Sequence, residues 1–69
     1  MHAGRLETSK RLQDTMTALA DGRWRSTRDI SALTGSMAVH SDIAGLRENN
    51  VEVETQRMGK RYYYRIGRE

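Results

Sequence analysis

Apolar residues recur at helical spacing in the first third of the chain, at Leu12, Met16 and Leu19. This i, i+4, i+7 pattern places the three side chains on one face of a helix, which must be buried. Thr8 or Ser9 can cap the start of this helix, because their hydroxyls accept hydrogen bonds from free backbone amides. Asp21-Gly22 ends it, since glycine readily adopts a left-handed conformation. Residues 1–8 show no apolar pattern and are expected to form a flexible segment.

A second, shorter helix is predicted after Ser26-Thr27-Arg28-Asp29. A serine followed three residues later by an acid is typical of a capping box, although aspartate is less common there than glutamate. Ile30 and Leu33 would form the buried face of this helix. Thr34-Gly35 breaks it within two turns.

A third helix is expected to begin near Ser36 and to run to about Asn49. Its core face has the same i, i+4, i+7 spacing and consists of Val39, Ile43 and Leu46. At 100° per residue, the outward face then follows from the core face. That outward face comprises Met37, Ser41, Ala44 and Glu48, flanked by His40, Gly45 and Arg47.

The last third of the chain alternates between polar and apolar residues in two runs, Val51–Thr55 and Tyr62–Ile66. Between them lies Arg57-Met58-Gly59-Lys60-Arg61, so the pattern predicts a β-hairpin with a basic tip. Tyr62 and Tyr64 share a strand face with Ile66 and are expected in the core. Tyr63 points the other way with Arg61 and Arg65, where its ring either stacks on a sugar or base or is simply exposed.

Arg23-Trp24-Arg25 alternates charged, aromatic and charged residues and is too short for a helix. We interpret it as a short strand that pairs with the hairpin, with Trp24 packed inward and both arginines outward. A loop in which Trp24 fills the core is the alternative. With the strand, the prediction is an α+β fold of three helices, a short strand and a C-terminal β-hairpin, within a domain spanning residues 9–67.

Composition excludes several classes of site in this chain of 69 residues. There is no cysteine, and the two histidines have no accompanying ligand spacing, so neither a disulfide nor a metal site is expected. No paired carboxylates, nucleophile with base, or glycine-rich phosphate loop is evident, so we expect no enzyme, no cofactor and no small-molecule ligand. The polar N-terminus and short apolar runs predict a cytoplasmic protein without a membrane partner.

Charge is unevenly distributed along the chain, whose net charge is +3. Residues 57–68 carry five basic side chains and no acidic one, whereas residues 41–54 carry four acidic side chains and one basic, Arg47. Ten of the twelve cations are arginine, which suits phosphate groups and guanine edges. The hairpin is therefore a better candidate for an anionic partner than the third helix. Alternatively, its charges only protect an exposed strand from aggregation.

Two helices separated by Thr34-Gly35 match a helix-turn-helix, whose second helix lies in the major groove of DNA. The candidate DNA-contacting residues are Arg28, Ser36, Met37, His40, Ser41, Ala44, Arg47, Arg57, Lys60, Arg61 and Tyr63. Ala44 and Gly45 would permit close approach, Met37 could touch a thymine methyl, and Arg47 would meet a phosphate. Simpler interpretations make His40 a surface residue and Met37 a gap filler. Asp42 either orients a basic side chain or is exposed.

Residues 12–66 resemble the short winged helix-turn-helix proteins of bacteriophages and prophages. The resemblance is carried by Ala20–Trp24, Thr27–Ile30, Leu33–Gly35, Ile43-x-x-Leu46-Arg47, Val53–Thr55 and Tyr64–Ile66. It implies a three-helix core with a β wing and, usually, binding to duplex DNA. Similar sequences often have a basic residue where this chain has Asp42, which weakens the expectation of base reading by the third helix.

These patterns together predict a duplex DNA-binding protein, either a transcriptional regulator or another factor of phage DNA transactions. Useful affinity from one small module would require tandem sites or a homodimer. The alternative is a protein-interaction module of the same fold, with the basic wing bound to an acidic surface of another protein.

Overall fold

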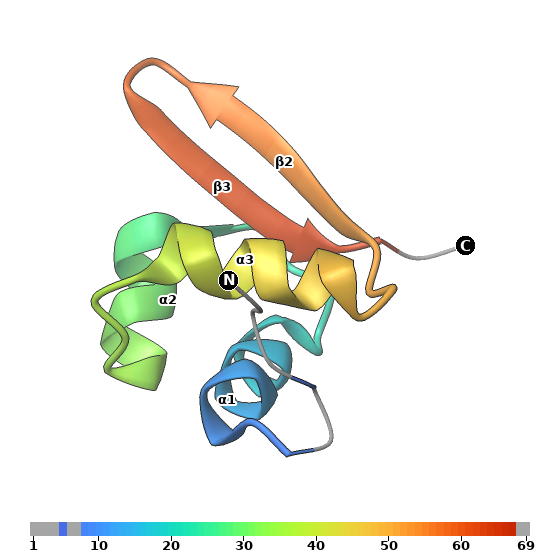
Figure 1. Cartoon of the computed structure of the whole chain (residues 1–69). Coiled ribbons are helices and arrows are strands. Elements are labelled where there is room, and N and C mark those ends of the chain that lie inside the picture. Colours follow the sequence, from blue (N-terminus) through green and yellow to red (C-terminus); the bar gives the residue numbers. More distant parts are fainter. Residues whose placement is uncertain (1–4, 6–7, 68–69) are drawn as a thin grey trace.

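The computed structural model describes residue 5 and residues 8–67. The elements follow in the order α1 (Lys10–Leu19), β1 (Arg25–Ser26), α2 (Thr27–Thr34), α3 (Val39–Glu48), β2 (Val53–Met58) and β3 (Arg61–Ile66). The strands form one antiparallel sheet in the order β1-β3-β2. This is the predicted α+β arrangement, and its topology resembles a winged helix-turn-helix (Figure 1). The flexible segment predicted for residues 1–8 lies, apart from Arg5 and Thr8, outside the described residues.

The starts of α1 and α2 are set by the residues that the sequence indicated. Ser9 caps α1, where its Oγ accepts a hydrogen bond from the Leu12 amide at 3.2 Å. The capping box of α2 is complete, because the Asp29 amide donates to Ser26 Oγ and the Ser26 amide donates to the Asp29 carboxylate. This backbone hydrogen bond from Ser26 is the main cause that lowers the pKa of Asp29.

The start of α3 was predicted about one turn too early. The helix begins at Val39, and residues 36–38 form the turn that follows Gly35, whose φ is 76°. Within this turn, Ser36 Oγ accepts a hydrogen bond from the Ala38 amide at 3.1 Å. A serine that bonds a nearby amide offers the backbone an alternative to helix, which explains the later start.

One apolar core joins the three helices to the sheet. Its buried members are Leu12, Leu19, Ile30, Val39, Ile43, Leu46, Val53 and Tyr64, with Met16, Val51 and Ile66 packed against them. The predicted faces of α1 and α3 are confirmed. Leu33 was placed wrongly in the core, because it is 60% exposed. The inward stripe of this two-turn helix instead pairs Ile30 with Thr34, one full turn later, and leaves Leu33 to one side.

The first strand lies later than predicted, at Arg25–Ser26, and its side chains are reversed. Arg25 turns inward and donates from Nε to the Ala18 carbonyl at 2.8 Å, and it pairs with Asp21 at 2.7 Å. Trp24 is 36% exposed and lies under the Arg65 guanidinium, 4.5 Å from its ring centre. The prediction that Trp24 packs inward is therefore wrong. Successive side chains alternate between the two faces of a sheet, so turning Arg25 inward puts Trp24 outside.

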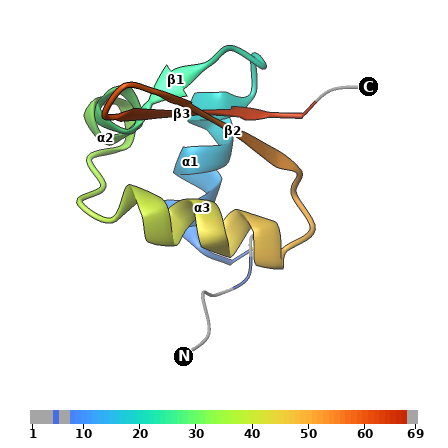
Figure 2. The ribbon, with the colours of Figure 1, turned by 90° about the horizontal axis from the view of Figure 1, so that it is seen from above.

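The hairpin has a two-residue loop, Gly59-Lys60, because Met58 pairs with Arg61. Gly59 has a φ of 63°, as such tight turns require. Arg57 and Arg61 thus belong to the strands and not to the loop. Figures 1 and 2 show the loop end rising above α2 while α3 runs along one side of the hairpin.

The three tyrosines of β3 differ in burial. Tyr64 is buried and Tyr63 faces the other side of the sheet, as predicted. Tyr62 is 41% exposed, so its assignment to the core is wrong. It has the correct strand face but lies near the loop end of the hairpin, where the helices beneath give less cover.

Candidate nucleic-acid interface

The outward face of α3 carries small and neutral side chains. Met37, in the turn before the helix, is 98% exposed, and His40, Ser41, Ala44 and Glu48 are exposed along the helix. This agrees with the predicted face. Gly45, however, is buried and cannot meet DNA. The part of the outward face that can approach a base edge closely is therefore formed by His40, Ser41 and Ala44.

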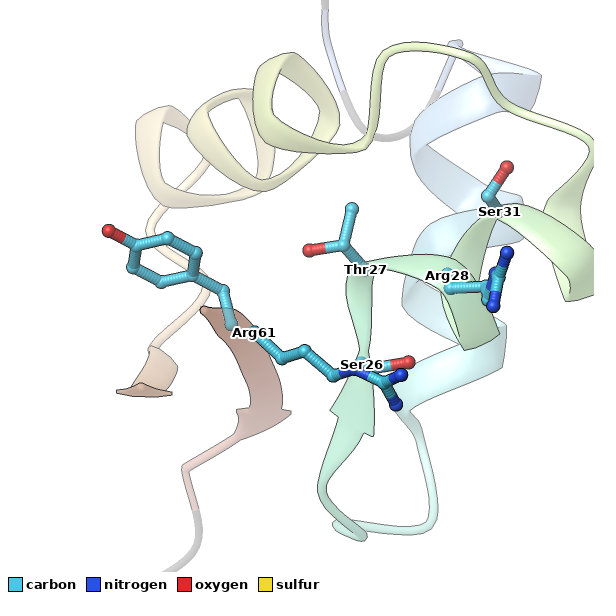
Figure 3. Close-up of a pocket in the computed structure, with 6 residues that line it drawn as sticks. Ser26, Thr27, Arg28, Ser31 and Arg61 are labelled. Atoms are coloured by element: carbon cyan, nitrogen blue, oxygen red, sulfur yellow. The ribbon is translucent and has the colours of Figure 1, made fainter. Parts of the chain in front are cut away.

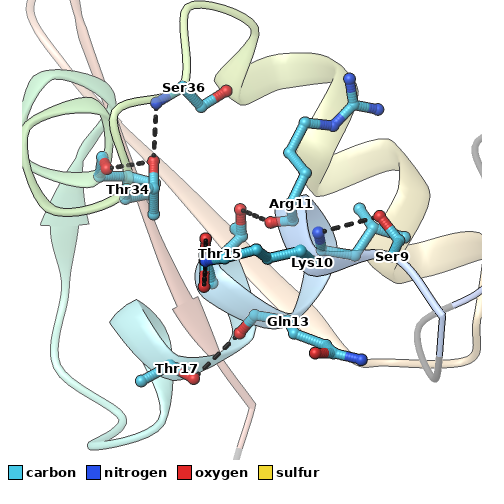
Figure 4. A network of polar contacts seen from close by, with 11 residues as sticks. Ser9, Lys10, Arg11, Gln13, Thr15, Thr17, Thr34 and Ser36 are labelled. Carbon is cyan, nitrogen blue, oxygen red and sulfur yellow. Dashed lines mark hydrogen bonds and ion pairs between the residues drawn. The ribbon is translucent and has the colours of Figure 1, made fainter.

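Asp42 lies on the inner side of α3 and is fully buried. Its Oδ2 accepts a hydrogen bond from Ser36 Oγ at 2.5 Å, and its Oδ1 lies 2.7 Å from Arg11 Nε in an ion pair whose direction is poor for a hydrogen bond. Figure 4 shows Arg11 on α1 and Ser36 on the turn before α3. Asp42 therefore orients a basic side chain, and it neither repels a DNA backbone nor occupies a base-reading position.

Ser36 and Arg47 are both occupied by internal contacts. Ser36 bonds Asp42, and Arg47 Nη2 donates to the Val53 carbonyl at 2.8 Å and to Thr55 Oγ1 at 2.7 Å. These bonds tie the end of α3 to β2. A phosphate contact by Arg47 would have to compete with them, because the same nitrogen serves both acceptors.

A row of rings links α3 to the hairpin. The His40 Nδ1 atom is 2.8 Å from the Tyr64 hydroxyl, and the His40 ring meets Tyr62 edge-on with 6.1 Å between ring centres. The Arg57 guanidinium lies 5.8 Å from the centre of the Tyr62 ring. Arg57, Tyr62 and His40 therefore form a continuous surface from the wing to the first turn of α3. The alternation in β3 placed Tyr62 in the core and so gave no sign of its contacts with His40 and Arg57.

A second surface lies where α2 begins. A pocket of about 310 Å³ is lined by Ser26, Thr27, Arg28, Ser31, Arg61 and Tyr62 (Figure 3). Arg61 reaches it from β3 and Arg28 from the first turn of α2. The guanidinium groups of Arg28 and Arg61 attract anions, so this surface suits a phosphate of a nucleic-acid backbone.

Cations without an acidic partner are concentrated at this end of the molecule, where Arg57 Nε donates to the Gly59 carbonyl at 3.0 Å. In the part of the chain that the structure describes, Arg28, Arg57, Lys60 and Arg61 make no ion pair with an acidic side chain. Five other cations have acidic partners: Lys10 with Asp14, Arg11 with Asp42, Arg23 and Arg25 with Asp21, and Arg65 with Glu54. Glu54 is thus neutralised at the sheet and does not oppose an anion at the tip.

Tyr63 and Arg65 lie on the outer face of the sheet. Arg65 is committed to Glu54 and to the ring of Trp24. Tyr63 is half-buried and pairs across the sheet with Gln56 and, on its other side, with Ser26. It therefore lies apart from the His40 surface, and stacking on a base by Tyr63 would need a different face of the molecule.

Comparison of the chain with protein-family models, with curated proteins and with solved structures found no match. Among residue 5 and residues 8–67, no cluster of three metal-ligating side chains occurs. In the same described residues, no helix is long and apolar enough to cross a bilayer.

Proposed function

We propose that this chain binds duplex DNA, with α3 in the major groove and the hairpin on the phosphate backbone or in the minor groove. The observation that carries the proposal is the group of four cations without ion pairs, Arg28, Arg57, Lys60 and Arg61, beside the exposed face of α3. Unpaired arginines at one end of a small domain supply the phosphate contacts that dominate affinity for DNA.

The shape of the exposed helix supports the same proposal. α3 has ten residues, and its outward positions at Ser41 and Ala44 are small. A helix of this size enters a major groove about 12 Å wide when no bulky side chain holds it away. The row from His40 through Tyr62 to Arg57 then continues from the groove toward the neighbouring backbone.

The biological role that we propose is transcriptional regulation or another DNA transaction of a bacteriophage or prophage, in the bacterial cytoplasm. This rests on the resemblance of the sequence and on the winged-helix topology. A homodimer or tandem sites would raise the modest affinity of one module.

The test is a titration of the protein into a labelled duplex of random sequence at low and at moderate salt. Each neutralised phosphate adds roughly 0.9 to the slope of log affinity against log salt. We expect micromolar-range binding at low salt that falls steeply as salt is added. No binding at low ionic strength would refute the DNA hypothesis.

One observation favours a protein-interaction module instead. Arg47 is the one basic side chain in residues 39–48, and it is bonded to β2, so α3 offers no free cation. In this second hypothesis, the wing docks on an acidic protein surface. It predicts no duplex binding at either salt, and capture of an acidic partner that is lost when Arg57, Lys60 and Arg61 are replaced by alanine.

A further inference from the structure

His40 is held in a defined orientation at the start of α3. Its Nδ1 is within hydrogen-bond distance of the Tyr64 hydroxyl, and its ring lies edge-on to both Tyr62 and Tyr64, with interplanar angles of 90° and 74°. Two aromatic contacts and one hydrogen bond restrict both torsions of the side chain. An exposed histidine without such neighbours would sample several rotamers.

The direction of the hydrogen bond fixes which ring nitrogen carries the proton. The Tyr64 hydroxyl has one proton to donate, and burial, the main cause, raises the pKa of Tyr64 so that this proton is retained. With the Tyr64 hydroxyl as donor, Nδ1 accepts this hydrogen bond, and the proton of a neutral imidazole then lies on Nε2.

The Nε2–H group is left free to meet a ligand. Within residues 8–67, Nε2 makes no hydrogen bond or ion pair, and the His40 side chain is exposed. We propose that His40 determines sequence specificity by presenting this single donor to a base-edge acceptor in the major groove, purine N7. The proposal rests on the proposed function, because it requires α3 to lie in the major groove.

Base reading suits this position better than a phosphate contact. Residues at the N-terminal end of a recognition helix meet base edges, and His40 is the second residue of α3. Both purines present N7 as an acceptor in the major groove, whereas cytosine presents its amino donor there. A ring locked as a donor therefore accepts a purine and rejects a cytosine at the base that it faces.

The first experiment determines the tautomer in the free protein. Nitrogen-15 NMR of the His40 ring in alkaline buffer, where imidazole is neutral, distinguishes the two forms. We expect the Nε2–H form alone in the wild type and a mixture in Tyr64→Phe, which removes the donor with little change in shape. A predominant Nδ1–H form, or an unchanged single form in Tyr64→Phe, would overturn the proposal without testing DNA binding.

The second experiment tests the base contact. After a preferred duplex is selected from random sequence, each purine in turn is replaced by its 7-deaza analogue, which lacks the N7 acceptor. We expect a roughly three- to tenfold loss of affinity at one purine, the effect of one hydrogen bond. The same replacement should cost His40→Ala nothing, while Glu48→Ala, at an exposed position later in the same helix, should keep the full penalty.

The outcomes separate the two proposals. If the protein binds duplexes but no 7-deaza replacement distinguishes the wild type from His40→Ala, the specificity assignment is wrong and the proposed function stands. If no duplex is bound at any salt, the proposed function fails and the role of His40 in reading DNA falls with it, whatever the tautomer.

Discussion

Three polar side chains near α3, Ser36, Asp42 and Arg47, stabilise the fold through internal contacts. Asp42 is buried between Ser36 and Arg11, and Arg47 bonds β2. Both contacts fix α3, one at its start and one at its end. At the residue scale, the helix proposed to enter DNA is thus positioned by its polar neighbours as well as by its apolar face.

Replacing Asp42 by alanine should destabilise the domain more than replacing Asp14. Asp42→Ala leaves Ser36 without its acceptor and Arg11 without its counter-charge, so the free energy of unfolding should fall by about 1–3 kcal/mol. Asp14 forms an exposed pair with Lys10, and Asp14→Ala should change the free energy by less than about 1 kcal/mol. Urea unfolding of both variants measures the difference, and equal effects would mean that the Arg11–Asp42–Ser36 contacts contribute little.

Among the elements, the short helix α2 depends on its caps and on one apolar stripe, whereas α3 depends on its apolar stripe. α2 has eight residues, and an isolated helix of that length is unstable in water. Its stability must therefore come from the complete capping box and from the burial of Ile30. α3 has no side-chain cap and relies on Val39, Ile43 and Leu46. Truncating a side chain within the apolar stripe should therefore lower the free energy of unfolding far more than truncating one beside it.

Leu46→Ala and Leu33→Ala test this contrast with the same chemical change. Leu46 is fully buried, and its truncation should lower the free energy of unfolding by about 2–5 kcal/mol, a large part of the stability of a small domain. Leu33 is mostly exposed, and its truncation should cost under about 1 kcal/mol. Thermal melting followed by circular dichroism is sufficient. An unchanged melting temperature for Leu46→Ala would show that α3 packs in another register.

At the scale of the whole molecule, the fold separates paired from unpaired charge. Acidic partners neutralise cations around α1, β1 and the outer face of the sheet, whereas the described cations at the hairpin end and at the start of α2 form no ion pair. Elements distant in the sequence meet there, because Arg28 and Arg61 line one pocket. The positive electrostatic potential near the hairpin loop and the start of α2 is therefore stronger than the net charge of +3 suggests.

Replacing Arg57, Lys60 and Arg61 together by alanine should weaken binding to all duplex sequences and reduce the salt slope by roughly two to three. The control is Arg5→Ala, Lys10→Ala and Arg23→Ala, which removes the same net charge away from the hairpin. Fluorescence anisotropy over a range of salt concentrations measures both slopes. If the two triple variants bound equally well, net charge alone would explain binding and the wing would have no special part.

Local sequence patterns specified most helices and strands of this protein. Apolar spacing identified the faces of α1 and α3, Ser26 with Asp29 identified the start of α2, and alternation around Gly59 identified the hairpin. These helix faces, caps and turns depend on residues a few positions apart in the chain, so the local sequence pattern is sufficient to predict them. The same holds for the basic tip, which is continuous in the chain.

Which side chains remain available to bind a partner depends on how the elements pack together. Asp42 is buried against Arg11, and Arg47 bonds β2. Trp24 lies on the outer face of the sheet because the first strand begins later than predicted, and Tyr62 is exposed near the hairpin loop. The orientation of His40 required Tyr64, 24 residues away in the chain. Such partners are chosen by the packing of distant elements, where each polar group must find a bond or remain in water. The local sequence pattern does not specify that choice.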